Sequence, residues 1–502
     1  MVKGGKKYKK NNLESFDEVV EDLNQGDESP DESEDEPVQL KTSIDLKKAK
    51  TLMRNAKVSV NGARKLLKVF RAACHISEDN QTNFDSPSTL TFILTRSIKV
   101  LPRIFRKIFN DKKLKDSTST SYKNSLRSFL SNTLFLLKQV QQEGLLADIF
   151  TGLGKVLNFF KFFPDLIKGF VKTSIKIWSE NEKIGKLVAY QFVRKCLVKE
   201  FYDKVGTMKL FYVSFTKNSK FMGWNNYQNV ETMRKCFVDL LGVDMSSSYQ
   251  VVFAILRQLA MYLSQTVKNP SSDRIKTIYN WQFLNSLILI GQSINTYKDL
   301  WDLAHPLVQI VTGILSLTNI PKYFPLKLHL LRVLISIQSQ CKYYIPSISP
   351  NICEVLTSVS LSKSTSNKKF KEFSFIMAIK TSKDQLQSQL YREQLVDEST
   401  ECLIEHFASI SNTMAFPELF LPVKITLKRH CKNLPNAVFR EKILHALKLI
   451  QESSEWVLSK REGVKEVVPG MNIEGRAPIL DKCEKILKRR QEIVNSKLNS
   501  NY

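Results

Sequence analysis

Few residues in this sequence have the types and spacing that enzyme chemistry requires. The segment Thr151-Gly152-Leu153-Gly154-Lys155 resembles part of a phosphate-binding loop. A complete loop has another glycine five residues before the second one, and serine or threonine after the lysine. Ile149 and Val156 occupy those two places. We therefore expect no nucleotide site here.

The residues that bind metals or act as nucleophiles are scattered. The six histidines are isolated, at positions 75, 305, 329, 406, 430 and 445. The eight cysteines include no CxxC pair, which argues against a zinc site or a disulfide framework and favours reduced thiols in the cytosol or nucleus. No HExxH, GxSxG or GxGxxG motif occurs. We expect no enzyme activity, no catalytic residue, no cofactor, no metal and no small-molecule substrate.

Positive charge is the strongest chemical signal in the chain. The 502 residues include 75 Lys and Arg against 49 Asp and Glu, a net charge of +26. Residues 1–40 hold 12 acidic and 5 basic side chains, so the remainder carries +33. A field of this size favours polyanionic partners such as RNA, DNA or acidic proteins.

Two clusters of basic residues are candidate contacts for RNA phosphates. Lys168, Lys172 and Lys176 recur at i, i+4 and i+8, which places them on one helix face. Arg103, Arg106 and Lys107 form a second face of this type. Clusters like these bind phosphate backbones through counterion release. The alternative for each cluster is a solvated helix surface.

The N-terminal region has its own charge pattern. Lys6, Lys7, Lys9 and Lys10 form a compact basic cluster typical of nuclear localisation signals. Ser29 and Ser33 lie in the acidic run from Asp27 to Glu36 and are candidate phosphorylation sites. With so little apolar surface to offset the entropy of ordering, residues 1–43 are expected to be a disordered tail that is lysine-rich first and acidic afterwards.

Helical periodicity dominates the rest of the chain. In Gln250–Lys268, one stripe of apolar residues recurs at helical spacing: Val252, Ile255, Leu256, Leu259, Leu263 and Val267. A further helix is expected at Val438–Arg461, and Gly and Pro are scarce throughout. Degenerate helix pairs without a repeated motif predict an all-α fold, a HEAT/armadillo-like α-solenoid of helical hairpins. We assign residues 44–462 to this helical-repeat scaffold domain, and residues 463–502 to a basic C-terminal tail with a short helix at Asp481–Leu498.

Membrane segments are not expected. Two long uncharged stretches, Thr277–Tyr297 and Leu303–Pro321, contain several Asn, Gln and other polar residues. A lipid-spanning helix tolerates few of these groups. Both stretches are better explained as buried helices, and the N-terminus has no apolar region of the kind found in secretory signals.

Several motifs, in order, resemble the nucleolar complex protein 2 family. The densest match runs from His305-Pro-Leu-Val-Gln to Ile320-Pro-Lys-Tyr-Phe-Pro and on to Arg332. Similar segments are Tyr249–Ala260, Ile278–Phe283 and Ala415–Pro422. The resemblance spans about residues 45–460.

The resemblance implies a nuclear scaffold. Family members assemble pre-60S (large-subunit) ribosomal particles, a process coupled to rRNA processing. They also transport these particles within the nucleus. They act together with nucleolar complex proteins one and three, in the nucleolus and nucleoplasm. Direct contact with rRNA would fit the basic clusters. The competing hypothesis is a nuclear chromatin- or histone-binding transcriptional regulator, because an acidic run such as Asp27–Glu36 can bind basic histone tails.

Overall fold

A computed structural model describes residues 44–76, 84–110, 116–181, 183–358, 373–461 and 473–499. Within these ranges the fold is all-helical, as predicted, and the only β-type pairing is a single bridge between Ile44 and Phe84. The chain divides into two compact units, Met1–Phe215 and Thr216–Tyr502, which we call unit 1 and unit 2. The sequence had suggested one scaffold domain over residues 44–462.

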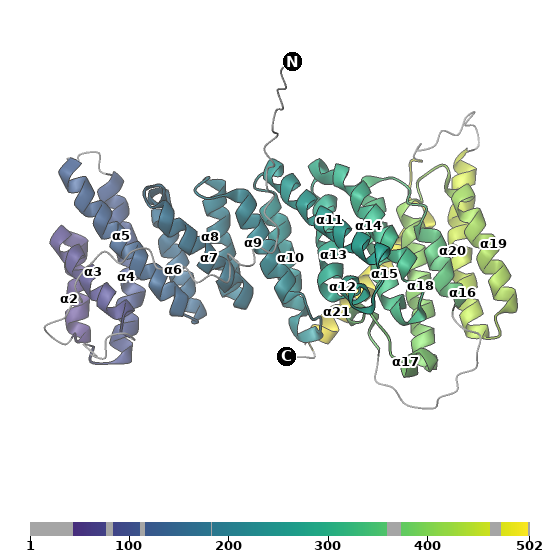
Figure 1. The fold of residues 1–502 in the computed structure, drawn as a ribbon, viewed down its shortest axis with the longest axis horizontal. Coiled ribbons are helices and arrows are strands. Elements are labelled where there is room, and N and C mark those ends of the chain that lie inside the picture. The colour runs from purple at the N-terminus through teal and green to yellow at the C-terminus, as the bar shows by residue number, and fades with distance from the viewer. Residues whose placement is uncertain are drawn as a thin grey trace, which may run out of the picture. The chain divides into compact units, whose positions relative to one another are not determined.

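Unit 1 consists of consecutive helices that stand side by side (Figure 1). Their bounds are α2 Leu46–Val58, α3 Val60–Cys74, α4 Pro87–Asn110, α5 Asp116–Gln139, α6 Glu143–Val156, the 3-10 helix η1 Leu157–Phe162, α7 Pro164–Glu180, α8 Lys183–Val198 and α9 Lys204–Asn218, which crosses the boundary to unit 2.

The helices of unit 1 pack in two rows. α3 contacts α5 and α5 contacts α7, whereas α4 contacts α6 and α6 contacts α8. Phenylalanines fill the space between the rows. The Phe129 ring lies 5.6 Å from Phe70 and 5.7 Å from Phe105, and Phe160 and Phe170 meet edge to face at 5.3 Å. Aromatic pairs of this kind add about 0.5–1.5 kcal/mol each beyond the burial of their area.

Unit 2 begins with four α-helices, and a further pair of α-helices follows them. The bounds of its first half are α10 Trp224–Leu241, α11 Met245–Lys268, α12 Ser272–Ile278, α13 Trp281–Thr296, η2 Lys298–Leu303, α14 Ala304–Leu317, η3 Pro321–Tyr323 and α15 Phe324–Cys341. The Asn280 side chain caps α13 by accepting a 2.8 Å hydrogen bond from the Phe283 amide. Pro325 lies in the first turn of α15, where a missing amide hydrogen does no harm.

In the second half of unit 2, the last helix packs against earlier helices of the same unit. Its elements are α16 Ile348–Ser358, η4 Phe375–Met377, α17 Lys383–Gln387, α18 Gln389–Ser409, α19 Phe416–Asn433, α20 Ala437–Arg461 and α21 Pro478–Asn499. The last helix, yellow in Figure 1, packs against α18 and α20 and reaches back to α10. The C-terminal segment, predicted as a tail with a short helix, thus contributes a 22-residue helix to this packing.

One helical stretch among the described residues, Lys298–Leu317, is long and apolar enough to cross a membrane by length and composition. It comprises η2 and α14, which pack against α11, α13 and α15. Leu307, Val311 and Ile314 are fully buried in these contacts. Packing in the core of unit 2 therefore accounts for the apolar composition of this stretch.

Candidate nucleic-acid interface

The three lysines predicted to share a face do so on α7. Neighbouring helices bury nearly every other side chain of α7, including Phe170, Ile175 and Trp178. What remains outside is a stripe that contains Lys168 and Lys176, both exposed, and Lys172, which is half-buried and has an interaction partner of its own. The stripe is the exposed side of α7, because neighbouring helices cover its other sides.

The same row of helices carries more positive charge that the sequence analysis missed. The additional basic residues with exposed or half-buried side chains are Arg64, Lys65 and Lys68 on α3, and Lys123, Arg127 and Lys138 on α5. Arg64 donates a 2.9 Å hydrogen bond to the Ser121 hydroxyl, which joins the surfaces of α3 and α5. We call these residues, with the three α7 lysines, the α3–α5–α7 face.

Small polar groups lie between the cations of this face. Ser121, Asn124 and Ser131 are exposed on α5. Phe162, in η1, is exposed, and the ammonium groups of Lys123 and Lys161 lie 5.2 and 5.1 Å from the centre of its ring. Lysine, arginine and hydroxyl groups of this kind bind phosphate oxygens without reading base sequence.

The second predicted cluster lies in the other row. Arg103, Arg106 and Lys107 are exposed on α4, so the structure does not bring them together with the α7 lysines. Lys99 of α4 forms a 2.7 Å ion pair with Asp148 of α6. Burial lowers the pKa of Lys155 on α6, and the nearby charges of Arg103 and Lys99 lower it further. Cations therefore crowd together where α4 meets α6.

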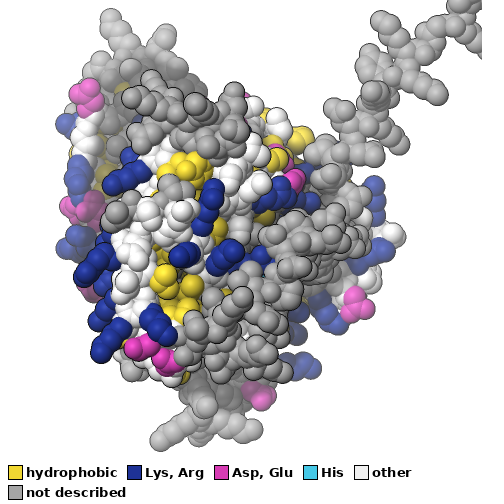
Figure 2. All heavy atoms as spheres, turned by 90° about the vertical axis from the view of Figure 1, so that its left-hand side faces the viewer, with side chains coloured by type: hydrophobic (Ala, Val, Ile, Leu, Met, Phe, Trp, Pro, Cys, Tyr) yellow, Lys and Arg dark blue, Asp and Glu magenta, His cyan; other side chains and the backbone are white. Residues whose placement is uncertain are grey.

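Figure 2 views the molecule from the end where α2–α5 lie. Where its residues are described, this side shows many Lys and Arg side chains, with apolar patches between them and fewer acidic side chains. Residues 44–215 hold 32 Lys and Arg against 13 Asp and Glu, a net charge of +19. Unit 1 is therefore the part of the molecule with the strongest attraction for a polyanion.

The segment that resembles a phosphate loop is helical. Thr151–Lys155 lies inside α6, where no loop is available to wrap a phosphate. A Cβ atom at Gly152 would lie 2.8 Å from the backbone oxygen of Ile98, so this glycine permits close packing of α4 on α6. The spacing of the glycines serves helix contact.

In unit 2, arginines pair with acids across helices. Arg332 of α15 forms an ion pair with Glu398 of α18, and Arg490 of α21 donates to Glu405 at 2.7 Å and to Glu398 at 3.1 Å. Burial raises the pKa of Glu398, but Arg332 and Arg490 outweigh burial and hold it below its ordinary value. Arg489 also pairs with Glu401. We call these residues the α15–α18–α21 ion-pair network.

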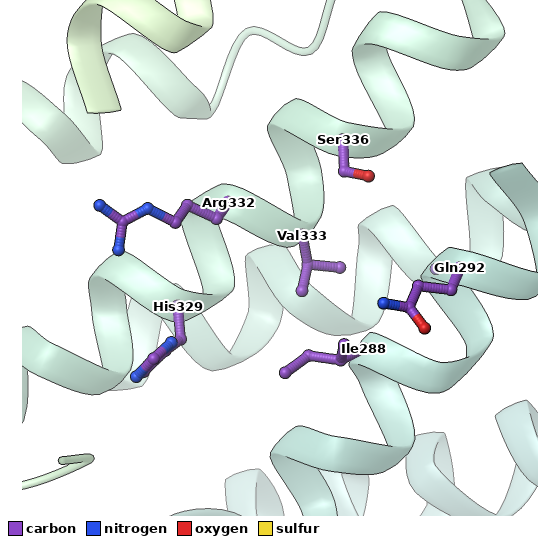
Figure 3. Close-up of a pocket in the computed structure, with 7 residues that line it drawn as sticks. Ile288, Gln292, His329, Arg332, Val333 and Ser336 are labelled. Atoms are coloured by element: carbon purple, nitrogen blue, oxygen red, sulfur yellow. The ribbon is translucent and has the colours of Figure 1, made fainter. Parts of the chain in front are cut away.

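A cavity of about 180 Å³ lies between α13 and α15, next to this network (Figure 3). Ile288, Gln292, Val333 and Ser336 line it together with His329 and Arg332. Burial lowers the pKa of His329 to about 4, helped by the Arg332 charge, so the imidazole is neutral at physiological pH. Among the described residues, no group of three His, Cys, Asp or Glu side chains is placed to hold a metal ion.

The remaining predicted sites fall outside the described residues. These are the candidate localisation residues Lys6, Lys7, Lys9 and Lys10 and the candidate phosphorylation residues Ser29 and Ser33.

Comparison with known proteins identifies relatives along most of the chain. The model of the Noc2p family matches residues 204–469. "Nucleolar complex protein 2" of Drosophila melanogaster is 30% identical over 341 residues, which are 67% of this chain and 44% of that protein. "Nucleolar complex-associated protein 2" of Arabidopsis thaliana is 25% identical over 472 residues, 88% of this chain and 62% of that protein. The chain thus spans about half the length of these relatives.

Proposed function

This chain belongs to the Noc2p family, and from that premise we propose that it is a nucleolar scaffold for ribosome biogenesis. In this proposal it assembles pre-60S particles and accompanies them through the nucleolus and nucleoplasm, in a complex with nucleolar complex proteins one and three. The names of the Drosophila and Arabidopsis relatives support the nucleolar location. The match of the family model to more than half of the chain supports a shared scaffold.

The proposed architecture is a HEAT-like solenoid in which hairpins such as α5/α6 and α7/α8 stack in order. The alternating contacts of α3, α5 and α7 in one row and α4, α6 and α8 in the other support this arrangement within unit 1. Stacked hairpins leave long helical surfaces for partners. A scaffold role without catalysis fits these surfaces, and no catalytic constellation enters the proposal.

The observation that carries the function is the α3–α5–α7 face. Its cations lie among hydroxyl groups. No Asp or Glu occurs between Lys168 and Lys176 on α7, and none occurs between Arg64 and Arg71 on α3. We infer that this face binds rRNA phosphates in the particle. Binding of this type is strong at low salt and weak at high salt, because it releases counterions from the nucleic acid.

Sedimentation tests the proposal against its alternative. The full chain, carrying a small affinity tag, should sediment with large-subunit precursor particles in a nuclear extract and co-purify with nucleolar complex proteins one and three. If it sediments with nucleosomes and is missing from the precursor particles, the chromatin- or histone-binding regulator becomes the better account.

Nuclear entry provides a second test. Replacing Lys6, Lys7, Lys9 and Lys10 with Ala should reduce nuclear accumulation of the chain several-fold, measured by fluorescence of a tagged protein in living cells. A basic run at Lys488-Arg489-Arg490 is the other candidate signal, but Arg489 and Arg490 are engaged with α18. An unchanged nuclear signal in the four-alanine variant would show that another segment or a partner directs entry.

A further inference from the structure

The two rows of unit 1 expose different kinds of side chain. The α3–α5–α7 face combines cations with hydroxyl groups. The other row exposes large aliphatic side chains on α8: Ile184 is 56% exposed, Leu187 45% and Val198 57%. Aliphatic groups add nothing to phosphate binding, so this surface favours a partner that is itself partly apolar.

The α6 helix lies between these aliphatic groups and the cations of α4, since it contacts both α4 and α8. Its outer side carries small residues. A Cβ atom at Gly144 or Gly154 would meet nothing within 4 Å, and Thr151 is exposed between them. Side chains along the outer side of α6 are therefore short. A helix could lie along this surface with cations on one side and aliphatic side chains on the other. We call this surface the α4–α6–α8 face.

The cations of α4 and α6 lie close together on this face, so a partner with acidic groups would bind it best. Lys99 has Asp148 as a partner, and the one other acid of α6 is Glu143 in its first turn. Arg103 and Lys155 lie near that pair, and Arg106 and Lys107 are exposed further along α4. A partner that offers carboxylates beside an apolar stripe would complement both halves of the face.

The chain itself contains a segment of that chemistry. In residues 13–23, Leu13, Phe16, Val20 and Leu23 recur at i, i+3, i+7 and i+10, the period of one helix face. The positions between them hold five carboxylates and no basic residue. The acidic side chains are Glu14, Asp17, Glu18, Glu21 and Asp22.

We propose that residues 13–23 bind the α4–α6–α8 face of the same molecule as an amphipathic helix. The apolar stripe covers Ile184 and Leu187, and the carboxylates meet the cations of α4 and α6. A helix over these eleven residues has a length of about 15 Å, against about 21 Å from Ile184 to Val198.

The tether permits this contact. Twenty residues separate Leu23 from Ile44, and an extended chain of that length reaches roughly 65 Å. A short flexible tether gives an effective concentration on the order of millimolar, so weak contacts suffice. The segment would cover one basic face of unit 1 in the free protein and leave the α3–α5–α7 face open to RNA. The binding itself does not depend on the proposed ribosomal function.

Carbodiimide cross-linking of the full chain tests the proposal directly, because the reagent joins only carboxylates and lysines in contact. Digestion and mass spectrometry should find Glu18 or Glu21 joined to Lys99, Lys107 or Lys155, with a yield that does not change on tenfold dilution. Phe16→Asp with Val20→Asp keeps every carboxylate but removes the apolar stripe, and should lower this yield at least fivefold.

Two surface variants complete the test. Ile184→Gln with Leu187→Gln should lower the cross-link yield as strongly as the Phe16 and Val20 changes. Phe221→Gln, which alters an exposed apolar side chain in unit 2, should leave it unchanged. The proposal is overturned if the cross-links join two chains, if they go mainly to Lys65, Lys68, Lys168 or Lys176, or if the apolar variants match the wild-type yield.

Discussion

Unit 1 and unit 2 use charged residues in different ways. The described part of unit 1 has few acids, and Arg127, Lys168 and Lys176 are exposed on α5 and α7. Residues 216–502 hold 37 Lys and Arg against 24 Asp and Glu, and many of these charges pair across helices, as Arg332, Arg490 and Glu398 do. Charged residues of unit 2 join helices, whereas unit 1 also exposes cations such as Lys168 and Lys176 on its surface.

The family match follows the same division. It begins at Lys204 and covers unit 2 as far as Pro469. The region that carries the family pattern is therefore the one with the internal ion pairs, and the strongly basic α2–α8 region precedes it. Substitutions of charged residues should therefore change the stability of unit 2, whereas in unit 1 they should change the binding of a partner.

The largest effect is expected at Arg332. Arg332→Met should lower the free energy of unfolding of unit 2 by about 3–5 kcal/mol, because Glu405 and Glu398 would lose a buried partner. Hydrogen exchange measured in increasing urea resolves the two units of one chain. Lys176→Met, on the surface of unit 1, should change the free energy of unfolding of unit 1 by less than about 0.5 kcal/mol. Equal small effects would mean that the network contributes little to stability.

Acid should also act on unit 2 first. Burial lowers the pKa of His329 to about 4 and that of His406 to about 3, against an ordinary value of 6.5. Below pH 6.5 the unfolded chain takes up protons on these histidines while the folded chain does not, so stability falls as the pH falls toward 4.

At pH 5.5 the expected loss is about 3 kcal/mol relative to pH 7.5, because each of the two histidines contributes about 1.4 kcal/mol at one pH unit below its ordinary pKa. Among the described residues unit 1 has one histidine, His75, and should lose much less. Hydrogen exchange at the two pH values, corrected for the intrinsic exchange rate, provides the measurement. Parallel losses in both units would contradict this assignment.

The smallest effect is expected for a surface pair. Arg461 holds Glu418 with two hydrogen bonds of 2.7 and 2.6 Å, but the Glu418 side chain is 63% exposed. Solvent screens such a pair, so Glu418→Gln should cost only about 0.2–1 kcal/mol. A loss as large as that of Arg332→Met would show that exposure does not separate the two kinds of ion pair.

Much of the fold could be predicted from the sequence because helical periodicity is local. The stripe Val252, Ile255, Leu256 and Leu259 is buried on α11 as predicted, and the predicted helix Val438–Arg461 matches α20 within one residue. Val267 belonged to the same predicted stripe but is exposed, whereas its neighbour Thr266 is buried.

The pairings across helices could not be predicted in this way. Arg332, Glu398 and Arg490 are separated by 66 and 92 residues, and nothing in the local pattern joins them. The basic face was predicted only in part for the same reason. Spacing along one helix places Lys168 and Lys176 together, but only the packing of α3 on α5 and of α5 on α7 adds Arg64 and Arg127 to their row. Which cations share a surface is decided by tertiary contacts.

The central claim is that the α3–α5–α7 face binds RNA through its phosphates. The direct test compares two charge-reversal variants of the full chain, which change the same net charge. One carries Arg127→Glu, Lys168→Glu and Lys176→Glu. The other carries Lys428→Glu, Arg429→Glu and Lys432→Glu on α19, where all three side chains are also exposed.

Affinity for a single-stranded rRNA fragment is measured between 50 and 300 mM salt. The unit 1 variant should bind at least tenfold more weakly at low salt, and its slope of log affinity against log salt should be shallower by about 0.7 for each lost contact. The α19 variant should keep nearly the wild-type slope. Equal slopes and affinities for the two variants would contradict the claim, since the binding would then follow net charge and not this face.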